Sequence, residues 1–310
     1  METLIAGAGA VGGYFGFVLA RAGWPITLLA RGERFEALRT QGLRVRSHGE
    51  EHTLQLPVVS DLAGFEEGSI DLVLATVKMP DLAPLAASLQ RVLAPDGLVV
   101  ALQNGLGADQ LLAAELGAAR VVGGAAYVGV DCPEPGLVRH IAGGRITLGA
   151  LPGIDKARAA RLSLHLEAAG VPCRVCDDLR ALRWGKLVWN AAYNPVSALA
   201  RVTVGEAADD PGLRDILRAA MEEVVAVGRA ARVALKDGIV ERNLTIRPEY
   251  REGLTSMRQD AEARRPNEAD AILGAVLRVA AEHHVATPTL TLLHALVTPL
   301  GPAASARNPS

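Results

Sequence analysis

The sequence predicts an α/β protein: an N-terminal Rossmann-type doubly wound domain followed by an all-helical C-terminal domain. A glycine-rich turn joins an apolar run to a helical stretch at the start of the chain. Strand and helix signals then alternate, and beyond Asp177 strand signals almost vanish. We therefore expect a Rossmann-type domain over residues 1–176, a helical domain over 177–300 and a disordered tail over 301–310.

The composition is that of an ordinary soluble protein and argues against a nucleic-acid-binding protein. The 310 residues are 50% apolar and 21% charged, enough for two domains with a substantial core. The 32 basic and 34 acidic side chains nearly cancel, and no basic run is interleaved with aromatic residues. Nucleic acid is therefore not expected as a partner, and an anionic ligand must be held by a local site.

Neither a membrane span nor a metal site is expected. Residues 3–20 are uncharged and mostly apolar, but no basic region precedes them and five glycines interrupt them. Cys132, Cys173 and Cys176 are an odd number of cysteines, which fits a reducing cytoplasm, so we predict a cytoplasmic protein. Strand alternation points Cys173 and Cys176 to opposite faces, which argues against zinc, and the histidines lack ligand spacing.

The glycine turn predicts dinucleotide binding. The apolar run 3–6 is followed by Gly7, Ala8, Gly9, Ala10, Val11 and Gly12, and then by a helical stretch to about residue 22. In such a motif the first glycine allows the tight turn, the second lets the backbone approach a pyrophosphate, and the third lets helix and strand pack closely. The free N–H groups of the helix favour an anion. The alternative is a glycine-rich turn without a ligand.

The end of the second predicted strand indicates which dinucleotide is bound. Residues 26–29 lead into Ala30-Arg31-Gly32-Glu33-Arg34. An acidic residue at this place usually binds the ribose 2′-hydroxyl of NAD, whereas an arginine accommodates a 2′-phosphate. We therefore predict NADPH as cofactor, with Arg31 as the chief phosphate ligand and Arg34 as its helper. The alternative is two arginines on an exposed loop.

Two polar residues follow predicted strands in the rest of the first domain. We expect a hairpin over 43–57, strands over 71–77 and 98–102, a helix from Asp81, antiparallel strands over 121–149, a helix over 155–168 and a strand over 172–176. Ligands of open α/β sheets collect at the carboxyl ends of strands. Lys78 and Asn104 are therefore candidates for contacting the nicotinamide end of the cofactor or the substrate.

A polar stripe marks the predicted helix over residues 178–199. Four-residue spacing places Lys186, Asn190 and Asn194 on one face, and Pro195 predicts that the helix ends or kinks near Asn194. Because this helix joins the two domains, we expect its stripe to face a cofactor bound at the sheet edge. The alternative is a solvent-exposed polar stripe.

A second polar patch lies nearer the C-terminus. Ser256 falls on a predicted helix, and Pro266-Asn267 opens another with Glu268 in its first turn. A carboxylate there is also favoured by the helix dipole alone, so the local sequence leaves a capping role for Glu268 open.

Taken together, these motifs resemble the ketopantoate reductase family, the 2-dehydropantoate 2-reductases of coenzyme A biosynthesis. The resemblance covers nearly the whole chain, through GAGAVGGYFG, LLARGER, VKMPD, QNGLG, WGKLVWNAAYNPVSAL and TSMRQD…RRPNEAD in order. It implies a catalytic role for Lys186 and Glu268, substrate binding by Asn190, Asn194 and Ser256, and positions near substrate and nicotinamide for Lys78, Asn104 and Glu268. Tyr193 and Ala269 depart from the family pattern, near the expected substrate pocket.

The resemblance implies NADPH-dependent reduction of 2-dehydropantoate to pantoate, with Lys186 as general acid. Burial would lower the pKa of Lys186 and Glu268 would raise it, so the sequence leaves its charge state open. One alternative is reduction of a different 2-oxo acid or carbonyl compound on the same fold, and another is a non-catalytic NADPH-sensing regulator. Monomer and homodimer both remain open.

Overall fold

The computed structural model describes residues 1–152 and 154–301, which form two compact units. Unit 1 comprises residues 1–103 and 107–179, and unit 2 comprises residues 104–106 and the chain from Arg180 onward. Residues 302–310 of the predicted tail lie outside the described residues. The predicted domain boundary after residue 176 stays a prediction.

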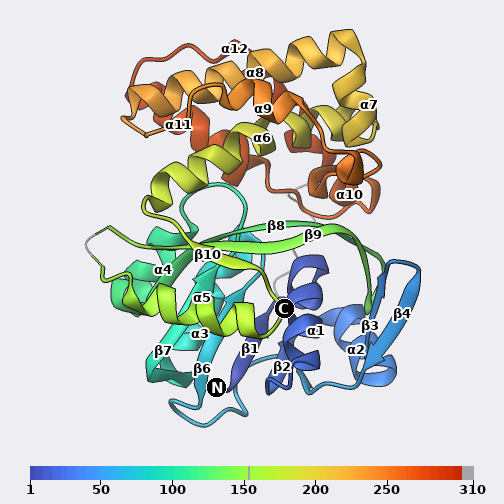
Figure 1. The fold of residues 1–310 in the computed structure, drawn as a ribbon, viewed down its shortest axis with the longest axis vertical. Coiled ribbons are helices and arrows are strands. Elements are labelled where there is room, and N and C mark those ends of the chain that lie inside the picture. Colours follow the sequence, from blue (N-terminus) through green and yellow to red (C-terminus); the bar gives the residue numbers. More distant parts are fainter. Residues whose placement is uncertain (153, 302–310) are drawn as a thin grey trace. The chain divides into compact units, whose positions relative to one another are not determined.

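Unit 1 is built on one ten-stranded sheet (Figure 1). Its spatial order is β4-β3-β9-β8-β7-β6-β1-β2-β5, with β10 also paired to β9. The strands are β1 (Thr3–Ala6), β2 (Ile26–Leu29), β3 (Leu43–Ser47), β4 (Glu50–Leu54), β5 (Val58–Val59), β6 (Ile70–Ala75), β7 (Leu93–Ala101), β8 (Val121–Glu134), β9 (Leu137–Ala150) and β10 (Cys173–Val175). Strands β5, β2, β1, β6, β7 and β8 pair in parallel, whereas β8–β9 and β3–β4 are antiparallel. The predicted hairpin and antiparallel extension are confirmed.

Helices cover both faces of this sheet. They are α1 (Ala10–Arg21), α2 (Gly32–Gln41), α3 (Met79–Val92), α4 (Ala108–Leu116) and α5 (Ala157–Ala168), with a 3-10 turn at Ala118–Arg120. Successive strand side chains point to opposite faces, so Ile5 packs with α1, α2 and α5 while Leu4 packs with α3 and α4. Both faces are therefore apolar, as a doubly wound sheet requires, and the predicted fold class is confirmed.

Unit 2 is helical, as predicted, and has one hydrophobic core. Its elements are α6 (Leu179–Ala200), α7 (Val204–Asp209), α8 (Pro211–Ala230), α9 (Ile239–Leu244), α10 (Ser256–Glu262), the π-helix η3 (Asp270–Gly274), α11 (Ala275–Glu282) and α12 (Pro288–Val297), with 3-10 turns at Pro248–Tyr250 and Thr298–Leu300. Leu187, Val224 and Ile272 are fully buried members of the core. Among the residues that the structure describes, no helix is both long and apolar enough to cross a membrane.

Of the predicted end or kink of helix α6 near Asn194, the end is wrong. The helix continues through Pro195 to Ala200. An interior proline removes the hydrogen bond that its own nitrogen would donate, and its ring crowds the carbonyl four residues earlier. The residues around it, Tyr193, Val196 and Ser197, are buried, so packing on both sides of Pro195 keeps this stretch helical.

The glycine turn between β1 and α1 is packed too closely for side chains at two positions. Gly7 has φ +104°, and a Cβ there would lie 2.7 Å from the backbone nitrogen of Val77. A Cβ at Gly12 would overlap the Gly7 carbonyl oxygen and Thr76 Oγ1, which itself donates to Gly7 O at 2.7 Å. The first and third glycines of the motif therefore serve the turn and the helix–strand contact.

We predict that Gly12→Ala destabilises the chain by about 1–3 kcal/mol, the usual cost of forcing a methyl group into a packed site. Urea unfolding measures this loss. Gly64→Ala is the matched control, because a Cβ at Gly64 meets nothing within 4 Å and its φ is not positive. Equal unfolding midpoints for the two variants would contradict this account of the turn.

Candidate active site

The candidate cofactor residues of unit 1 follow three neighbouring parallel strands. Residues 7–12 follow β1, Arg31 follows β2, and Lys78 follows β6, and these strands are adjacent in the order β6-β1-β2. Arg31 is exposed at the N-cap of α2, and Lys78 is the N-cap of α3. Carboxyl ends of parallel strands meet at one edge of a sheet, so these groups share the edge where dinucleotides bind.

The donor set of this edge fits a dinucleotide phosphate chain. Gly9 is the N-cap of α1, and the first turn of α1 contains no acidic side chain. Its free N–H groups and the helix dipole favour negative charge. Arg31 adds a guanidinium suited to a phosphate ester.

In unit 2, α6 presents the predicted stripe to an amide from another segment. Lys186 Nζ donates to Asn104 Oδ1 at 2.9 Å, and Asn190 Nδ2 donates to the same oxygen at 3.4 Å. Asn104 Nδ2 in turn donates to Glu268 Oε2 at 3.1 Å. We call these four residues the Lys186 cluster. It unites three segments that are far apart in the sequence.

The backbone beside Asn104 is fixed by the π-helix η3. Leu106 N donates to Ala271 O at 3.2 Å, and Gly105 has φ +82°. A Cβ at Gly105 would overlap the carbonyl of Ala271, so only glycine permits this approach. A π-helical turn within a longer helix is a feature often found at functional sites. Here its Ala271 carbonyl serves to hold Asn104 in place.

Glu268 stands immediately before the helical segment and not in its first turn, because the helix begins later than the predicted opening at Pro266-Asn267. Helical residues begin at Ala269, whose N–H donates to Asn267 Oδ1 at 3.0 Å. The carbonyl of Glu268 accepts from Ile272 N at 3.0 Å. Asn267 thus provides the side-chain cap, and the Glu268 carboxylate accepts a hydrogen bond from Asn104.

The electrostatic balance at Lys186, which the sequence left open, favours a lowered pKa. Burial, and after it the nearby charge of Arg183, lower the pKa of Lys186, while the charge of Glu268 raises it, and together these effects bring the pKa to about 8. Arg183 is a buried residue that the sequence reasoning missed. Its position three residues before Lys186 on α6 was an available signal, because residues three apart are neighbours on a helix surface.

The structure does not join every predicted site residue to this cluster. Among the described residues, no hydrogen bond links Asn194 or Ser256 to Lys186, Asn104 or Glu268. Asn194 is buried one turn beyond Asn190 on α6, and Ser256 is the exposed first residue of α10.

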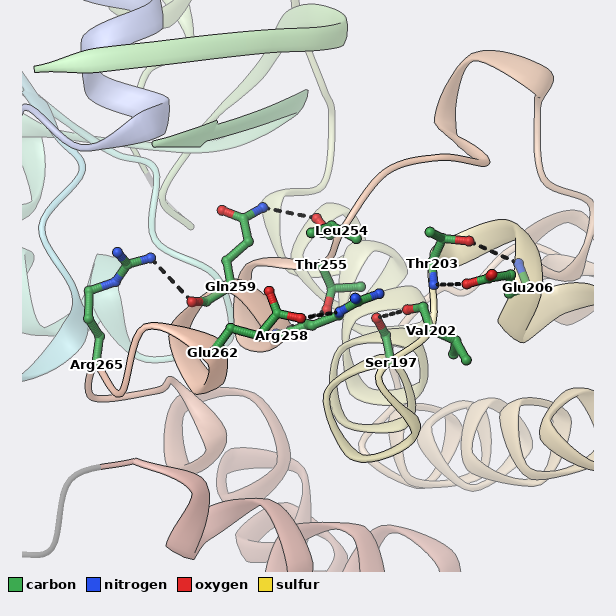
Figure 2. A network of polar contacts seen from close by, with 10 residues as sticks. All are labelled: Ser197, Val202, Thr203, Glu206, Leu254, Thr255, Arg258, Gln259, Glu262 and Arg265. Atoms are coloured by element: carbon green, nitrogen blue, oxygen red, sulfur yellow. Dashed lines mark hydrogen bonds and ion pairs between the residues drawn. The ribbon is translucent and has the colours of Figure 1, made fainter. Parts of the chain in front are cut away.

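Helix α10, which carries Ser256, is held by polar contacts at both ends (Figure 2). Thr255 Oγ1 accepts from Arg258 N at 3.3 Å, which caps the first turn. Gln259 Nε2 donates to Leu254 O at 3.0 Å, and Arg258 Nε pairs with Glu262 Oε1 at 2.7 Å. The backbone at Ser256 is therefore fixed while its side chain stays accessible.

Tyr193, expected near the substrate pocket, lies in the helical core. Its ring is fully buried and stacks on Trp189, with 4.8 Å between ring centroids. Burial raises the pKa of Tyr193 to about 12, and the charges that act on it belong to Arg214, Arg251 and Asp209. None of these residues is in the Lys186 cluster, and the ring of Tyr193 packs in the core of unit 2.

We predict that Glu268→Gln lowers the pKa of Lys186 below 8, because it removes a charge that raises this pKa and keeps an oxygen that can accept from Asn104. The lysine ε-methylene resonances of ¹³C-labelled protein report the titration. The chain has only four lysines, Lys78, Lys156, Lys186 and Lys236, so assignment by single substitution is practical. An unchanged or raised pKa would contradict the proposed charge balance.

Comparison with known proteins agrees with this architecture. Residues 3–153 match the family described as ketopantoate reductase PanE/ApbA, and residues 178–300 match the ketopantoate reductase PanE/ApbA C-terminal family. The chain is 34% identical to the 2-dehydropantoate 2-reductase of Mesorhizobium japonicum, over 96% of this chain and 97% of that protein. It is 32% identical to that of Halobacterium salinarum, over 96% of this chain and 98% of that protein.

Solved structures show the same fold. The crystal structure of 2-dehydropantoate 2-reductase from Geobacter metallireducens has a TM-score of 0.89 at 33% identity, covering 96% of this chain and 99% of that chain. A D-mandelate dehydrogenase solved with NADH and anilino(oxo)acetate has a TM-score of 0.90, covering 97% and 98%, but at 24% identity this likeness concerns the fold alone. On the family matches and the relatives above 30% identity, the chain belongs to the ketopantoate reductase family.

Proposed function

We propose that this protein catalyses the NADPH-dependent reduction of 2-dehydropantoate to pantoate in pantothenate and coenzyme A biosynthesis. The observation that carries the proposal is the Lys186 cluster, which places an ammonium group of lowered pKa beside neutral amide groups. Relatives over nearly the full length of the chain are named for this reaction. The proposal assigns the two units to one reaction, with unit 1 binding the cofactor.

Reduction of a ketone requires an acid at the carbonyl oxygen. When bound, NADPH supplies the hydride that adds to the 2-keto carbon. Negative charge then grows on the keto oxygen, and Lys186 stabilises this oxygen by a charge-assisted hydrogen bond and transfers a proton to it. A pKa of about 8 keeps Lys186 roughly nine-tenths protonated at pH 7, while making its proton easier to donate than that of an exposed lysine.

The other members of the cluster orient the acid. Asn104 Oδ1 accepts from Lys186 and directs the ammonium group, and Asn104 links it to Glu268. The Glu268 charge limits the fall in the pKa of Lys186 and so preserves the protonated form. We propose that Asn190, Asn194 and Ser256, which are neutral, bind the carboxylate and hydroxyl groups of the substrate, and that Lys78 acts near the nicotinamide.

The proposed preference for NADPH rests on Arg31. It stands directly after Ala30, where an NAD-preferring site usually has an acidic residue, and its side chain is exposed. A guanidinium at this position pairs with the 2′-phosphate that distinguishes NADPH from NADH.

We predict that Lys186→Ala lowers kcat by roughly two to four decades, the usual worth of a general acid, while NADPH binding survives. In the unsubstituted protein we expect kcat/KM to fall as the pH rises through about 8, because Lys186 is then deprotonated. The kcat/KM of the variant should not show this decrease. Stopped-flow NADPH oxidation measures both. Lys236→Ala is the control, since Lys236 is exposed. Normal turnover by Lys186→Ala would refute the mechanism.

We predict that 2-dehydropantoate is a far better substrate than 2-oxoisovalerate, which lacks its terminal hydroxyl. A site built to bind a hydroxyl rejects the analogue without it by a factor on the order of 10⁴ in kcat/KM. Initial rates at 340 nm with NADPH, repeated with NADH, measure substrate and cofactor preference together. Equal efficiency with both acids would indicate a reductase of another 2-oxo acid, and NADPH binding without turnover of any carbonyl compound would indicate a regulator.

A further inference from the structure

We propose that Arg34 binds the pyrophosphate of the dinucleotide at the glycine turn, leaving recognition of the 2′-phosphate to Arg31. This inference rests on the proposed function, since it takes a nicotinamide dinucleotide as the ligand. Each arginine then binds a different phosphate group, whereas the sequence suggested both as ligands of the 2′-phosphate.

The side chain of Arg34 reaches back from α2 to the glycine turn. Arg34 lies in the first turn of α2, three residues after Arg31. A Cβ built on Gly9 would lie 3.1 Å from Arg34 Nη1, so the guanidinium rests against the α-carbon of Gly9. Arg31, by contrast, is exposed at the N-cap of α2. The two guanidinium groups therefore serve different parts of the site.

Gly9 differs from its neighbours in what surrounds it. Cβ atoms at Gly7 and Gly12 would meet backbone atoms, which cannot move aside. A Cβ at Gly9 would meet only Arg34 Nη1 within 4 Å among the described residues, and this is the far end of a flexible side chain. The fold therefore does not require glycine at position 9. The space against Gly9 is the space that a pyrophosphate occupies in this motif, and Arg34 borders it.

One donor of Arg34 is buried without a partner. Arg34 Nε makes no hydrogen bond with any residue that the structure describes, although solvent does not reach it. Buried donors in proteins are nearly always paired, and those that are not call for an explanation such as a missing ligand. A phosphate oxygen is the acceptor that best matches a guanidinium, because two parallel N–H groups bind two oxygens.

The helix behind Gly9 attracts the same chemical group. α1 is twelve residues long, begins at Ala10, and has no acidic side chain in its first turn. Its N-terminal N–H groups and the Arg34 guanidinium both adjoin Gly9, so together they provide a positively polarised site for a diphosphate. The pyrophosphate is common to NADPH and NADH, so Arg34 contributes affinity without discriminating between them.

The test is dinucleotide binding by calorimetry in the absence of substrate, with Arg34→Gln, Arg31→Gln and Arg39→Gln. Arg39 is the matched control, because it lies on the same helix and pairs with Glu36 at the exposed surface. The probes are NADPH, NADH, ADP-ribose, which has the pyrophosphate alone, and 2′-AMP, which has the 2′-phosphate alone. Melting temperatures verify that each variant is folded.

We expect Arg34→Gln to weaken NADPH, NADH and ADP-ribose by the same factor, on the order of tenfold, and to leave 2′-AMP unchanged. Arg31→Gln should weaken NADPH and 2′-AMP while sparing NADH and ADP-ribose. Arg34→Lys keeps the positive charge but loses the paired N–H donors of the guanidinium, so its affinity for NADPH should lie between those of the parent and Arg34→Gln.

Two results would overturn the inference. If Arg34→Gln weakens 2′-AMP and NADPH but spares ADP-ribose, Arg34 binds the 2′-phosphate. If all four probes bind the folded variant as they bind the parent, Arg34 only packs against the turn. If instead the proposed function is wrong, the parent protein will bind NADPH normally but will not reduce 2-dehydropantoate, a result that is independent of the Arg34 variants.

Discussion

The geometry of the Lys186 cluster depends on one side-chain amide. A single oxygen of Asn104 accepts from both Lys186 and Asn190, and its NH₂ group donates to Glu268. A partly buried ammonium needs an acceptor, and a neutral amide provides one without the full charge that would raise the pKa of Lys186. The amide can do this only because Gly105 and Leu106 are held on the carbonyl of Ala271.

Burial and two neighbouring charges then set the pKa of the lysine. Burial and Arg183 lower the pKa of Lys186, and Glu268 keeps it from falling further. α6 has two functions at once, because Trp184, Leu187 and Val188 pack in the core while Lys186 and Asn190 belong to the cluster. The continuation of α6 through Pro195 is a product of this packing.

The glycine turn of unit 1 shows a comparable division of tasks among similar residues. Gly7 and Gly12 are required by backbone contacts of the fold, whereas a Cβ at Gly9 would meet, among the described residues, only the side chain of Arg34. Three glycines of one motif are thus distinguished by what a methyl group would meet. The arginines after β2 are distinguished in the same way, Arg31 by exposure and Arg34 by its contact with Gly9.

Local pattern by itself determined the two-part α/β and helical architecture, the glycine turn and the Lys186–Asn190 face of α6, because helix and strand periods depend on neighbours in sequence. Only the tertiary structure decided that Asn104 meets Lys186 and Glu268, which are 82 and 164 residues away, and that Tyr193 lies in the core. It also decided the direction of the pKa shift of Lys186 and the course of α6 past Pro195. Burial and long-range hydrogen bonds depend on which segments pack together in the folded chain. The spacing of residues within one segment does not contain this information.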